Sequence, residues 1–582
     1  MATAMRPLLN IDDLSLELRR DIQWNPILNH IHFSLNEGES LGIVGESGSG
    51  KSVTALSIMR LLNPNIARYP SGSILFHPQK EGEQPLDLLK APESVMQTLR
   101  GNQIGMIFQE PMTSLNPVIR CGEQITEQIL LHTKVSEKEA KEQVLHLFDE
   151  VKLPRPAQLF DSYPHELSGG QKQRIMIAMA MSCNPRLLIA DEPTTALDVT
   201  IQKNILELIH NLQEKYGMGV LFITHDLGVV AEIADRTIVM YKGDIVEENS
   251  VRNIFLNPQN AYTKQLIACR PSMTTRLSKL PQVSDFDGNT DVDMQQVIQQ
   301  LTVTPQERQA AHKTLYAGDK IVSVKNLNKV YKVRKRKLFE KQQYFHALHD
   351  ISLDIYEGET LGLVGESGCG KTTLGRSMLR LIEPSSGDVF YRGKNLVQLP
   401  SSEMRKMRKE MQIILQDPYS SLNQRLTIGE ALMEPMRVHG ILSNDKERKS
   451  RVIELLERVS LNESHFYRYP HEFSGGQRQR ISIARALAVN PKFIICDESV
   501  SALDVSVQAQ VLNLLNELKS EYHFTYIFIS HDLSVVKFMA NRIAVMQQGV
   551  IVEIGEADAL CSHPQTEYTK KLISAIPKGI LN

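Results

Sequence analysis

The sequence lacks the features that mark several large classes of protein. Its 582 residues contain no apolar run of the roughly 18 to 20 residues needed to cross a bilayer, so we do not expect the chain to span a membrane by itself. Lysine and arginine number 65 against 67 aspartate and glutamate, which argues against bulk electrostatic binding to nucleic acid. The first seven residues lack the basic and apolar segments of a secretory signal, which predicts a cytoplasmic protein.

Cysteine is also scarce and scattered. The sequence has six cysteines and no CxxC pair, which predicts reduced thiols rather than a disulfide framework or a zinc site. The chain is too long for one hydrophobic core, so two domains are expected. The cysteines are Cys121, Cys183, Cys269, Cys369, Cys496 and Cys561.

What the sequence does contain is a repeated octet that fits the phosphate-binding pattern G-x-x-x-x-G-K-[ST]. It reads GESGSGKS at 45–52 and GESGCGKT at 365–372, each time between a strand-like apolar run and a helical pattern. The glycines let backbone N–H groups curl around phosphate oxygens, the lysine reaches the β- and γ-phosphates, and the hydroxyl binds Mg²⁺. The predicted nucleotide-binding residues are Gly45, Ser47, Gly48, Gly50, Lys51, Ser52 and Val53, and Gly365, Ser367, Gly368, Gly370, Lys371, Thr372 and Thr373.

Two carboxylates follow an apolar strand-like run in each half. Asp191 and Glu192 follow LLIA, and Asp497 and Glu498 follow FIIC. A carboxylate at a strand tip beside a phosphate loop can bind Mg²⁺, and the next one can deprotonate an attacking water. Such a pair is often only a solvated turn, but its repetition downstream of two phosphate loops favours chemistry.

The repetition extends over the whole chain. Ser474 follows Ser168 by 306 residues, and His531 follows His225 by the same number, so the chain is a tandem repeat. Between the repeats lies a polar stretch with Pro, Gly and Asp interruptions, which indicates a linker with little core of its own. We predict a first domain over 1–269, a linker over 270–319 and a second domain over 320–582.

The stretches between the phosphate loop and the paired acids identify a family. SGGQ at 168–171 and at 474–477 resembles the signature motif of the ABC ATPase family, which most P-loop proteins lack. The resemblance covers both halves and nearly all of the chain outside the linker. It implies an α/β fold of two tandem P-loop ABC ATPase domains, each a mixed-sheet RecA-like core with a helical subdomain and an antiparallel β subdomain.

The resemblance also assigns roles. In the family, ATP lies between the phosphate loop of one domain and the signature motif of the other, so each half is expected to complete the site of its partner. It implies that Ser168, Gly169, Gly170, Gln171, Ser474, Gly475, Gly476 and Gln477 contact nucleotide, and that Glu192, Glu498, His225 and His531 are catalytic. It makes Gln109 and Gln416 the Q-loop glutamines and Asp198 and Asp504 the D-loop aspartates, with Mg²⁺ bound by Ser52, Gln109, Asp191, Thr372, Gln416 and Asp497.

Some positions depart from the family pattern. Where the family stacks an aromatic ring on adenine, the second half has Tyr331 but the first has Leu18; Trp24 is a possible substitute, although a structural role in its hairpin is the simpler interpretation. The thiol of Cys369 lies inside the second phosphate loop, where it fills space or serves as an alkylation probe of the site.

Finer resemblance points to the dipeptide, oligopeptide and nickel branch of bacterial importers, with a layout similar to the ATPases of glutathione and microcin C importers. The stretches 109–117 and 416–423 and the tails 257–266 and 563–572 carry it. It implies ATP and Mg²⁺ as cofactors, two multi-span permease subunits as partners, an indirect role for a substrate-binding protein, no nucleic acid, and a peripheral place on the cytoplasmic face of the inner membrane. Cys269 and Cys561 are single, so no iron–sulfur cluster is expected.

Two other functions remain open at this point. A tandem ABC ATPase can act on ribosomes or nucleic acid without meeting a membrane. Ribosome-bound translation factors of this kind typically join their halves by a long charged helical hairpin, which this linker does not resemble. A nucleotide-binding scaffold without turnover is a second alternative, and Glu192 and Glu498 argue against it. The preferred prediction is the ATP-hydrolysing subunit of an importer for peptides or peptide-like solutes.

Overall fold

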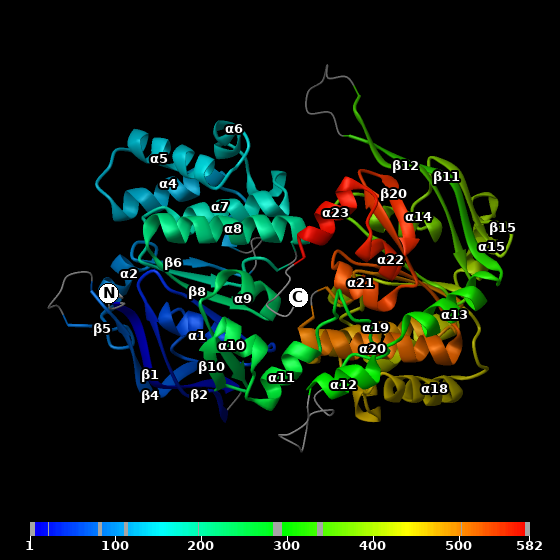
Figure 1. The fold of residues 1–582 in the computed structure, drawn as a ribbon, viewed down its shortest axis with the longest axis horizontal. Helices are drawn as coiled ribbons and strands as arrows, with labels where there is room; N and C mark the ends of the chain where they lie inside the picture. Colours follow the sequence, from blue (N-terminus) through cyan, green and yellow to red (C-terminus); the bar gives the residue numbers. More distant parts are fainter. Residues whose placement is uncertain are drawn as a thin grey trace.

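Two α/β halves lie next to each other along the long axis of the molecule (Figure 1). The computed structural model describes residues 6–20, 23–78, 84–109, 114–195, 197–282, 294–333, 342–501 and 503–576. Each half contains a six-stranded sheet, a four-stranded antiparallel sheet and a set of helices, which confirms the predicted fold class. Within the described ranges, no helix combines the length and the apolar character needed to cross a membrane.

The six-stranded sheets form the centre of each half. Their inner strands are parallel and buried on both faces, which explains their continuous apolar sequences. In sheet order the strands of the first half are β10 (Asp244–Ser250), β9 (Arg236–Tyr241), β3 (Ser40–Val44), β8 (Gly219–Thr224), β7 (Leu187–Asp191) and β6 (Ile104–Ile107). Those of the second are β20 (Val550–Glu556), β19 (Arg542–Gln547), β13 (Thr360–Val364), β18 (Thr525–Ile529), β17 (Phe493–Asp497) and β16 (Met411–Ile414).

The antiparallel sheets pack against the phosphate-loop side of each core. In sheet order the first contains β2 (Gln23–Asn36), β1 (Pro7–Arg20), β4 (Ala67–Phe76) and β5 (Leu86–Asp87). The second contains β12 (Tyr344–Tyr356), β11 (Lys320–Lys332), β14 (Ser386–Tyr391) and β15 (Lys394–Asn395). Apolar residues of these strands share a buried cluster with the strand that precedes the phosphate loop, so the loop is built on a packed base.

Helices complete each half. In the first half they are α1 (Lys51–Ile58), α2 (Glu93–Leu99), α4 (Cys121–His132), α5 (Glu137–Glu150), α6 (Pro156–Phe160), α7 (Gly169–Met181), α8 (Val199–Tyr216), α9 (Leu227–Ile233), α10 (Val251–Leu256) and α11 (Ala261–Ala268). The stretch between the halves contains α12 (Met294–Leu301) and α13 (Pro305–Tyr316). The second half contains α14 (Lys371–Met378), α15 (Ser401–Met407), α16 (Pro418–Ser421), α17 (Ile428–Val438), α18 (Asp445–Arg458), α19 (Gly475–Leu487), α20 (Val505–Tyr522), α21 (Leu533–Met539), α22 (Ala557–Ser562) and α23 (Glu567–Ser574).

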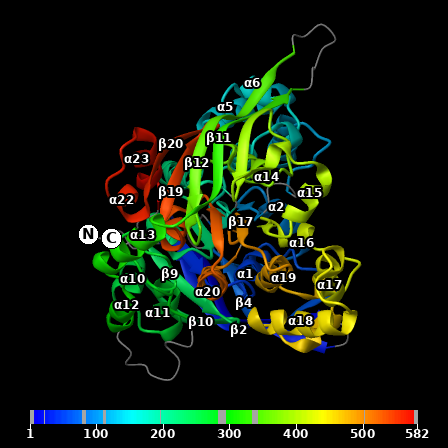
Figure 2. The same cartoon turned by 90° about the vertical axis from the view of Figure 1, so that its right-hand side faces the viewer.

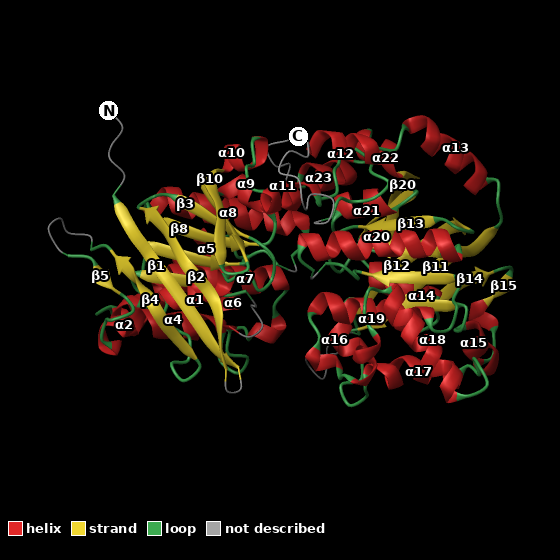
Figure 3. Ribbon diagram, turned by 90° about the horizontal axis from the view of Figure 1, so that it is seen from below, coloured by secondary structure: helices red, strands yellow, loops and turns green. Residues whose placement is uncertain are grey.

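The halves are arranged head to tail. In Figure 1, α4, α5 and α6 of the first half lie on the same side of the molecule as β11 and β12 of the second. Figure 2 shows α17 and α18 at the opposite end of the second half from β11 and β12, and the view from below keeps the two halves side by side (Figure 3). This arrangement presents the middle of each half to the other.

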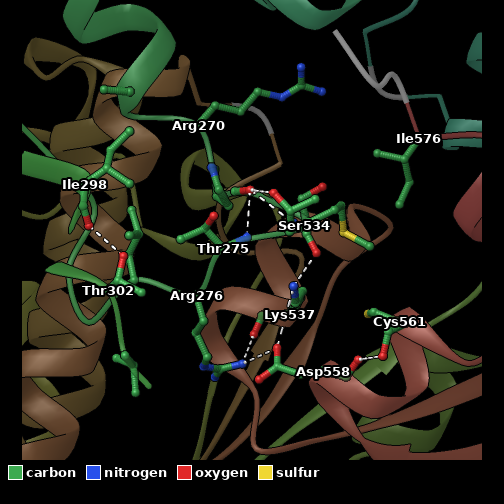
Figure 4. Close-up of a pocket in the computed structure, with 18 of the residues that line it drawn as sticks. Arg270, Thr275, Arg276, Ile298, Thr302, Ser534, Lys537, Asp558, Cys561 and Ile576 are labelled. Carbon is green, nitrogen blue, oxygen red and sulfur yellow. Dashed lines mark hydrogen bonds and ion pairs between the residues drawn. The ribbon is translucent and has the colours of Figure 1, made fainter. Parts of the chain in front are cut away.

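The linker packs on the second half. The guanidinium of Arg276 donates to the carbonyl oxygen of Ala540 at 2.8 Å and lies 3.4 Å from the Asp558 carboxylate, a contact visible in Figure 4. The side-chain amide of Asn513 makes two hydrogen bonds to the backbone of Leu280, at 2.8 and 2.9 Å. Leu280 is fully buried in the apolar cluster of the second half, so this part of the linker is anchored by core packing.

Candidate nucleotide sites

The glycines of each octet have backbone angles that favour glycine. A Cβ on Gly45 would lie 2.2 Å from the carbonyl oxygen of Met240, so a side chain cannot fit there. Each loop ends at the N-terminus of a helix whose first residue is the octet lysine, and this geometry presents backbone N–H groups and the positive end of the helix dipole to an anion. The φ angles are 153°, 82° and 107° at Gly45, Gly48 and Gly50, and 152°, 78° and 108° at Gly365, Gly368 and Gly370.

The lysine of each loop is buried and folded back onto its own loop. Lys51 Nζ donates to the carbonyl oxygens of Gly45 and Glu46 at 2.7 and 2.8 Å, and Lys371 makes the equivalent bonds at 2.7 and 3.0 Å. Burial lowers the pKa of Lys51, and the charge of Glu192 is the largest of the effects that oppose this shift. To reach a phosphate, each lysine must leave these two carbonyls.

The hydroxyl at the end of each octet meets the first carboxylate of the acid pair. Ser52 Oγ donates to Asp191 Oδ1 at 3.0 Å, and Thr372 Oγ1 donates to Asp497 Oδ1 at 2.9 Å. Burial raises the pKa of Asp191 to about 6 and also raises the pKa of Asp497. A hydroxyl and a carboxylate at this separation are the oxygen donors that Mg²⁺ prefers, so the residues fit a magnesium ion.

The second carboxylate of the first half is held in a strained position. Glu192 has a φ of 47° although it is not glycine, a backbone strain that is common at functional sites. Its Oε2 accepts from Gln109 Nε2 at 3.1 Å and from Thr195 Oγ1 at 2.8 Å, and lies 3.3 Å from His225 Nδ1. That Nδ1 has no partner with hydrogen-bond geometry among the described residues, so the approach of His225 is a charge contact.

The contact between Glu192 and His225 shifts the pKa values of both groups. Burial works to raise the pKa of Glu192, but His225, Thr195 and Lys51 together outweigh it and hold the pKa at about 2. Burial opposes protonation of His225, but Glu192, Asp226 and Asp504 together outweigh it and raise the pKa of His225. The first half therefore keeps its second carboxylate ionised.

The second half repeats the arrangement with small differences. Glu498 has a φ of 48° and accepts from Gln416 Nε2 at 2.7 Å, while His531 Nδ1 lies 3.8 Å from its carboxylate. Ser501 occupies the position of Thr195, but its hydroxyl donates to the backbone carbonyl of Glu498, at 3.0 Å, instead of the carboxylate. Burial works against ionisation of Glu498, but His531 and Lys371 together outweigh it and lower the pKa of the carboxyl.

The SGGQ motifs begin the helices α7 and α19. Ser168 Oγ accepts from the N–H of Gln171, whose side-chain oxygen accepts from the Ser168 N–H at 3.0 Å, and Ser474 and Gln477 form the same capping box. The side-chain hydrogen bonds of both serines stay within their own motif, and Ser168, Gly169, Ser474 and Gly475 are exposed. In the part of the chain that the structure describes, the motifs thus lie at helix N-termini, and no hydrogen bond of these serines joins them to the opposite phosphate loop.

The aspartates that follow the acid pairs do cross between the halves. Ser47 Oγ in the first phosphate loop donates to Asp504 Oδ1 at 3.2 Å, and the N–H of Ser367 in the second donates to Asp198 Oδ1 at 2.7 Å. The hydroxyl of Ser506, two residues after Asp504, also donates to the Glu46 carboxylate. Each phosphate loop is therefore in contact with the other half.

Comparison with known proteins decides the family. The family model described as ABC transporter matches residues 28–195 and 348–501, and the model described as oligopeptide/dipeptide transporter, C-terminal region, matches residues 246–289 and 552–579. The chain belongs to the ABC transporter family. This confirms the predicted family and places each nucleotide-binding half of this ABC protein around a matched segment.

The ABC protein has close curated relatives. The glutathione import ATP-binding protein GsiA of Pectobacterium atrosepticum is 47% identical over 569 residues, which cover 98% of this chain and 89% of the relative. The GsiA protein of Escherichia coli strain K12 is 47% identical over 572 residues, with the same two coverages. Among solved structures, a dimeric ATP-binding cassette bound to ADP and phosphate covers 40% of this chain and 98% of its own, at 30% identity and a TM-score of 0.37.

The positions predicted to stack on adenine have different surroundings in the two ABC halves. Tyr331 is 37% exposed, and Lys329 Nζ lies 5.0 Å from the centre of its ring. Leu18 instead packs partly buried against the first core. The Trp24 ring faces the guanidinium of Arg68 at 4.5 Å, a contact within the first antiparallel sheet.

The thiol in the second phosphate loop belongs to the core. Cys369 is 7% exposed in the apolar cluster of the second antiparallel sheet, and burial raises the pKa of its thiol. A buried, protonated thiol is a poor nucleophile, so Cys369 fills space and is not a useful alkylation probe.

A separate cavity of about 1310 Å³ lies beside the nucleotide sites of the ABC protein (Figure 4). The first tail, the linker and the last helices of the second half line it, and none of its described lining residues belongs to a phosphate loop. Its charged groups pair with each other, as Lys537 and Asp558 do at 3.7 Å. His225, which contacts Glu192 in the first candidate nucleotide site, also lines the cavity, so the two spaces adjoin.

Sequence reasoning missed several contacts of these sites. It did not single out Thr195 and Ser506, or the tail tyrosines Tyr262 and Tyr568, which accept hydrogen bonds from the N–H groups of Glu46 and Glu366. The spacing of 306 residues between the two tyrosines was a signal that could have found them.

Proposed function

We propose that this ABC ATPase powers an importer for peptides or peptide-like solutes, with glutathione as a leading candidate cargo. The cargo class is supported by the 47%-identical relatives, which are glutathione import ATP-binding proteins, and by the oligopeptide/dipeptide transporter C-terminal regions in both halves. The domains run over 1–269 and 320–582, joined by the linker 270–319. The chain acts with two permease subunits and a substrate-binding protein, from the cytoplasmic side of the inner membrane.

The observation that carries the proposal is the pairing of the two halves through their phosphate loops. Asp198 and Asp504 each contact the loop of the other half, so the loops lie at the contact between the halves. In the proposed closed state each SGGQ motif, now exposed at a helix N-terminus, approaches the opposite loop and adds N–H donors to the γ-phosphate. When the halves approach and separate, the segments after Gln109 and Gln416 move with them. These segments receive the permeases. Residues 110–113 of the first segment lie outside the described residues.

The chemistry follows from the residues around each loop. Ser52 and Asp191 would hold Mg²⁺, which neutralises charge on the β- and γ-phosphate oxygens when bound. Lys51 leaves its loop carbonyls to bind those oxygens, and Glu192, ionised by its environment, takes the proton of the attacking water. Gln109 and His225 orient this carboxylate from two sides. The equivalent residues of the second half act in the same way.

Uptake in cells tests this function. Cells that lack the gene for this chain should lose uptake of isotope-labelled glutathione or of a labelled dipeptide, and the wild-type gene should restore it. The matched control is the Glu192→Gln, Glu498→Gln variant, which keeps the fold and the partners but not the turnover. Restoration of uptake by this control would refute ATP-driven import.

Purification identifies the partners. The tagged chain, extracted from membranes with a mild detergent, should bring two multi-span permeases with it. Ribosomal proteins or nucleic acid in their place would overturn the transport proposal and leave the ATP chemistry intact.

A further inference from the structure

A tyrosine from the C-terminal tail of each half touches the phosphate loop of the same half. The N–H of Glu46 donates to Tyr262 Oη at 3.1 Å, and the N–H of Glu366 donates to Tyr568 Oη at 3.1 Å. Tyr262 is 7% exposed, and Tyr568 is half-buried. The same bond is made twice, by tail helices that lie far along the chain from the loops they contact.

Each tyrosine is held in place by its own half. The Glu247 carboxylate on β10 accepts from the N–H groups of Gln259 and Asn260, at 2.9 and 3.0 Å, and fixes the turn before α11. The ring of Tyr262 then packs on that of Tyr241 at the end of β9, with 4.3 Å between the ring centres. Since β9 pairs with β3, which leads into the phosphate loop, the tyrosine is tied to the same sheet as the loop.

The second tail is fixed in the same manner. The Glu553 carboxylate on β20 accepts from the N–H groups of Gln565 and Thr566, at 2.9 and 3.1 Å, before α23 begins. Burial raises the pKa of Tyr568 to about 12, so its phenol is neutral near pH 7. Both tyrosines therefore present a fixed, uncharged oxygen to the loop.

Glu46, whose N–H makes this bond, also binds the loop lysine through its carbonyl oxygen. The carbonyl oxygen of Glu46 accepts from Lys51 Nζ at 2.8 Å, while its N–H donates to Tyr262. The Glu46 carboxylate accepts from Ser506 of the other half. Without the phenol oxygen, a half-buried N–H would lose its partner, and the start of the loop would gain freedom to rotate.

We propose that Tyr262 and Tyr568 are positioning residues for ATP binding, each fixing the start of its phosphate loop in the conformation that receives the phosphates. Through them the C-terminal tail of each half becomes part of the nucleotide site. The inference rests on the proposed assignment of the two phosphate loops.

The test replaces each phenol by a phenyl ring in the full-length chain. Tyr262→Phe with Tyr568→Phe keeps the ring packing and removes only the two oxygens. Loss of one hydrogen bond per loop should weaken ATP binding and raise KM for ATP by about threefold to tenfold, with kcat nearly unchanged. Binding is measured directly with a fluorescent ATP analogue at equilibrium and KM by phosphate release.

Tyr241→Phe is the matched control. It removes a hydroxyl from the other ring of the same stacked pair, and no hydrogen bond from that hydroxyl to the loop exists among the described residues. We expect wild-type affinity from it. Wild-type affinity in the Tyr262→Phe, Tyr568→Phe variant, or a loss as large in Tyr241→Phe, would overturn the inference. Failure of the wild-type chain itself to bind the analogue would instead overturn the assignment of the loops.

Discussion

The two aspartates that cross between the halves make unequal contacts, and this inequality predicts unequal effects of mutation. Asp198 is 5% exposed and accepts a backbone N–H of the second phosphate loop at 2.7 Å. Asp504 is half-buried, and its carboxylate accepts the hydroxyl of Ser47, which is exposed, at 3.2 Å. A short bond to a buried carboxylate contributes about 2 kcal/mol, whereas a long one that water can replace contributes about 0.5 kcal/mol.

These energies translate into different losses of affinity. Asp198→Ala should raise KM for ATP at the second site by about 30-fold, and Asp504→Ala should raise it at the first site by about twofold. The KM of each site is measured after the other site has been inactivated. Asp198→Ala is therefore combined with Glu192→Gln, and Asp504→Ala is combined with Glu498→Gln. Phosphate release against ATP concentration gives both constants.

The Asn variants are the controls. Asp198→Asn keeps an oxygen that can accept the Ser367 N–H but loses the charge, so its effect should lie between those of aspartate and alanine. Equal losses for Asp198→Ala and Asp504→Ala, or a larger loss for Asp504→Ala, would refute the reasoning from burial and distance.

Three further predictions concern the bases, the linker and the buried thiol. Glu192→Gln with Glu498→Gln should retain ATP but lower the rate of phosphate release by at least about 100-fold, since proton transfer to a general base contributes that much; near-normal release would exclude these residues as bases. Asn513→Leu leaves the N–H and C=O of Leu280 buried without partners and should lower the free energy of unfolding of the second half by about 3 kcal/mol, seen in denaturant titration and absent if the linker is not anchored there. Cys369 should resist iodoacetamide in the native protein and react after unfolding, as mass spectrometry of the peptides would show; rapid native labelling would contradict its burial.

The short motifs could be predicted because contiguous residues dictate them. A strand, a glycine loop and a helix N-terminus place Lys51 and Ser52 without help from distant parts of the chain. The repetition of these motifs then predicts two domains with the same fold. The capping role of Ser168 also follows from a local pattern, a serine three residues before glutamine at the start of a helix.

Contacts between distant segments could not be predicted in this way. The bond of Tyr262 to Glu46 spans more than 200 residues, and it depends on how β10 and α11 pack beside β3. The left-handed backbone of Glu192 depends on the N–H that it donates to Ile223 on the neighbouring strand. Neither feature has a signature in its own neighbourhood, because tertiary packing decides it.

The structure also shows that a repeated sequence need not give two equal sites. Thr195 donates to the Glu192 carboxylate of the first half, whereas Ser501 at the matching position donates to a backbone carbonyl. Ser506 reaches Glu46 across the interface, whereas the hydroxyl of Thr200, which matches Ser506 in the other half, is buried without a hydrogen-bond partner in the described structure.

These differences all lie at the contact between the halves or beside Glu192 and Glu498, the proposed bases. The phosphate loops themselves are nearly identical, with matching glycine angles and matching lysine bonds. In a dimer of identical halves, symmetry would make both interfaces the same, but two different halves fused into one chain have no such constraint. The common loop chemistry therefore constrains which ligand each site binds. The contacts around the loops can differ, and they set the affinity and the lifetime of the bound ligand at each site. Any functional inequality between the two sites should therefore arise from these surrounding contacts.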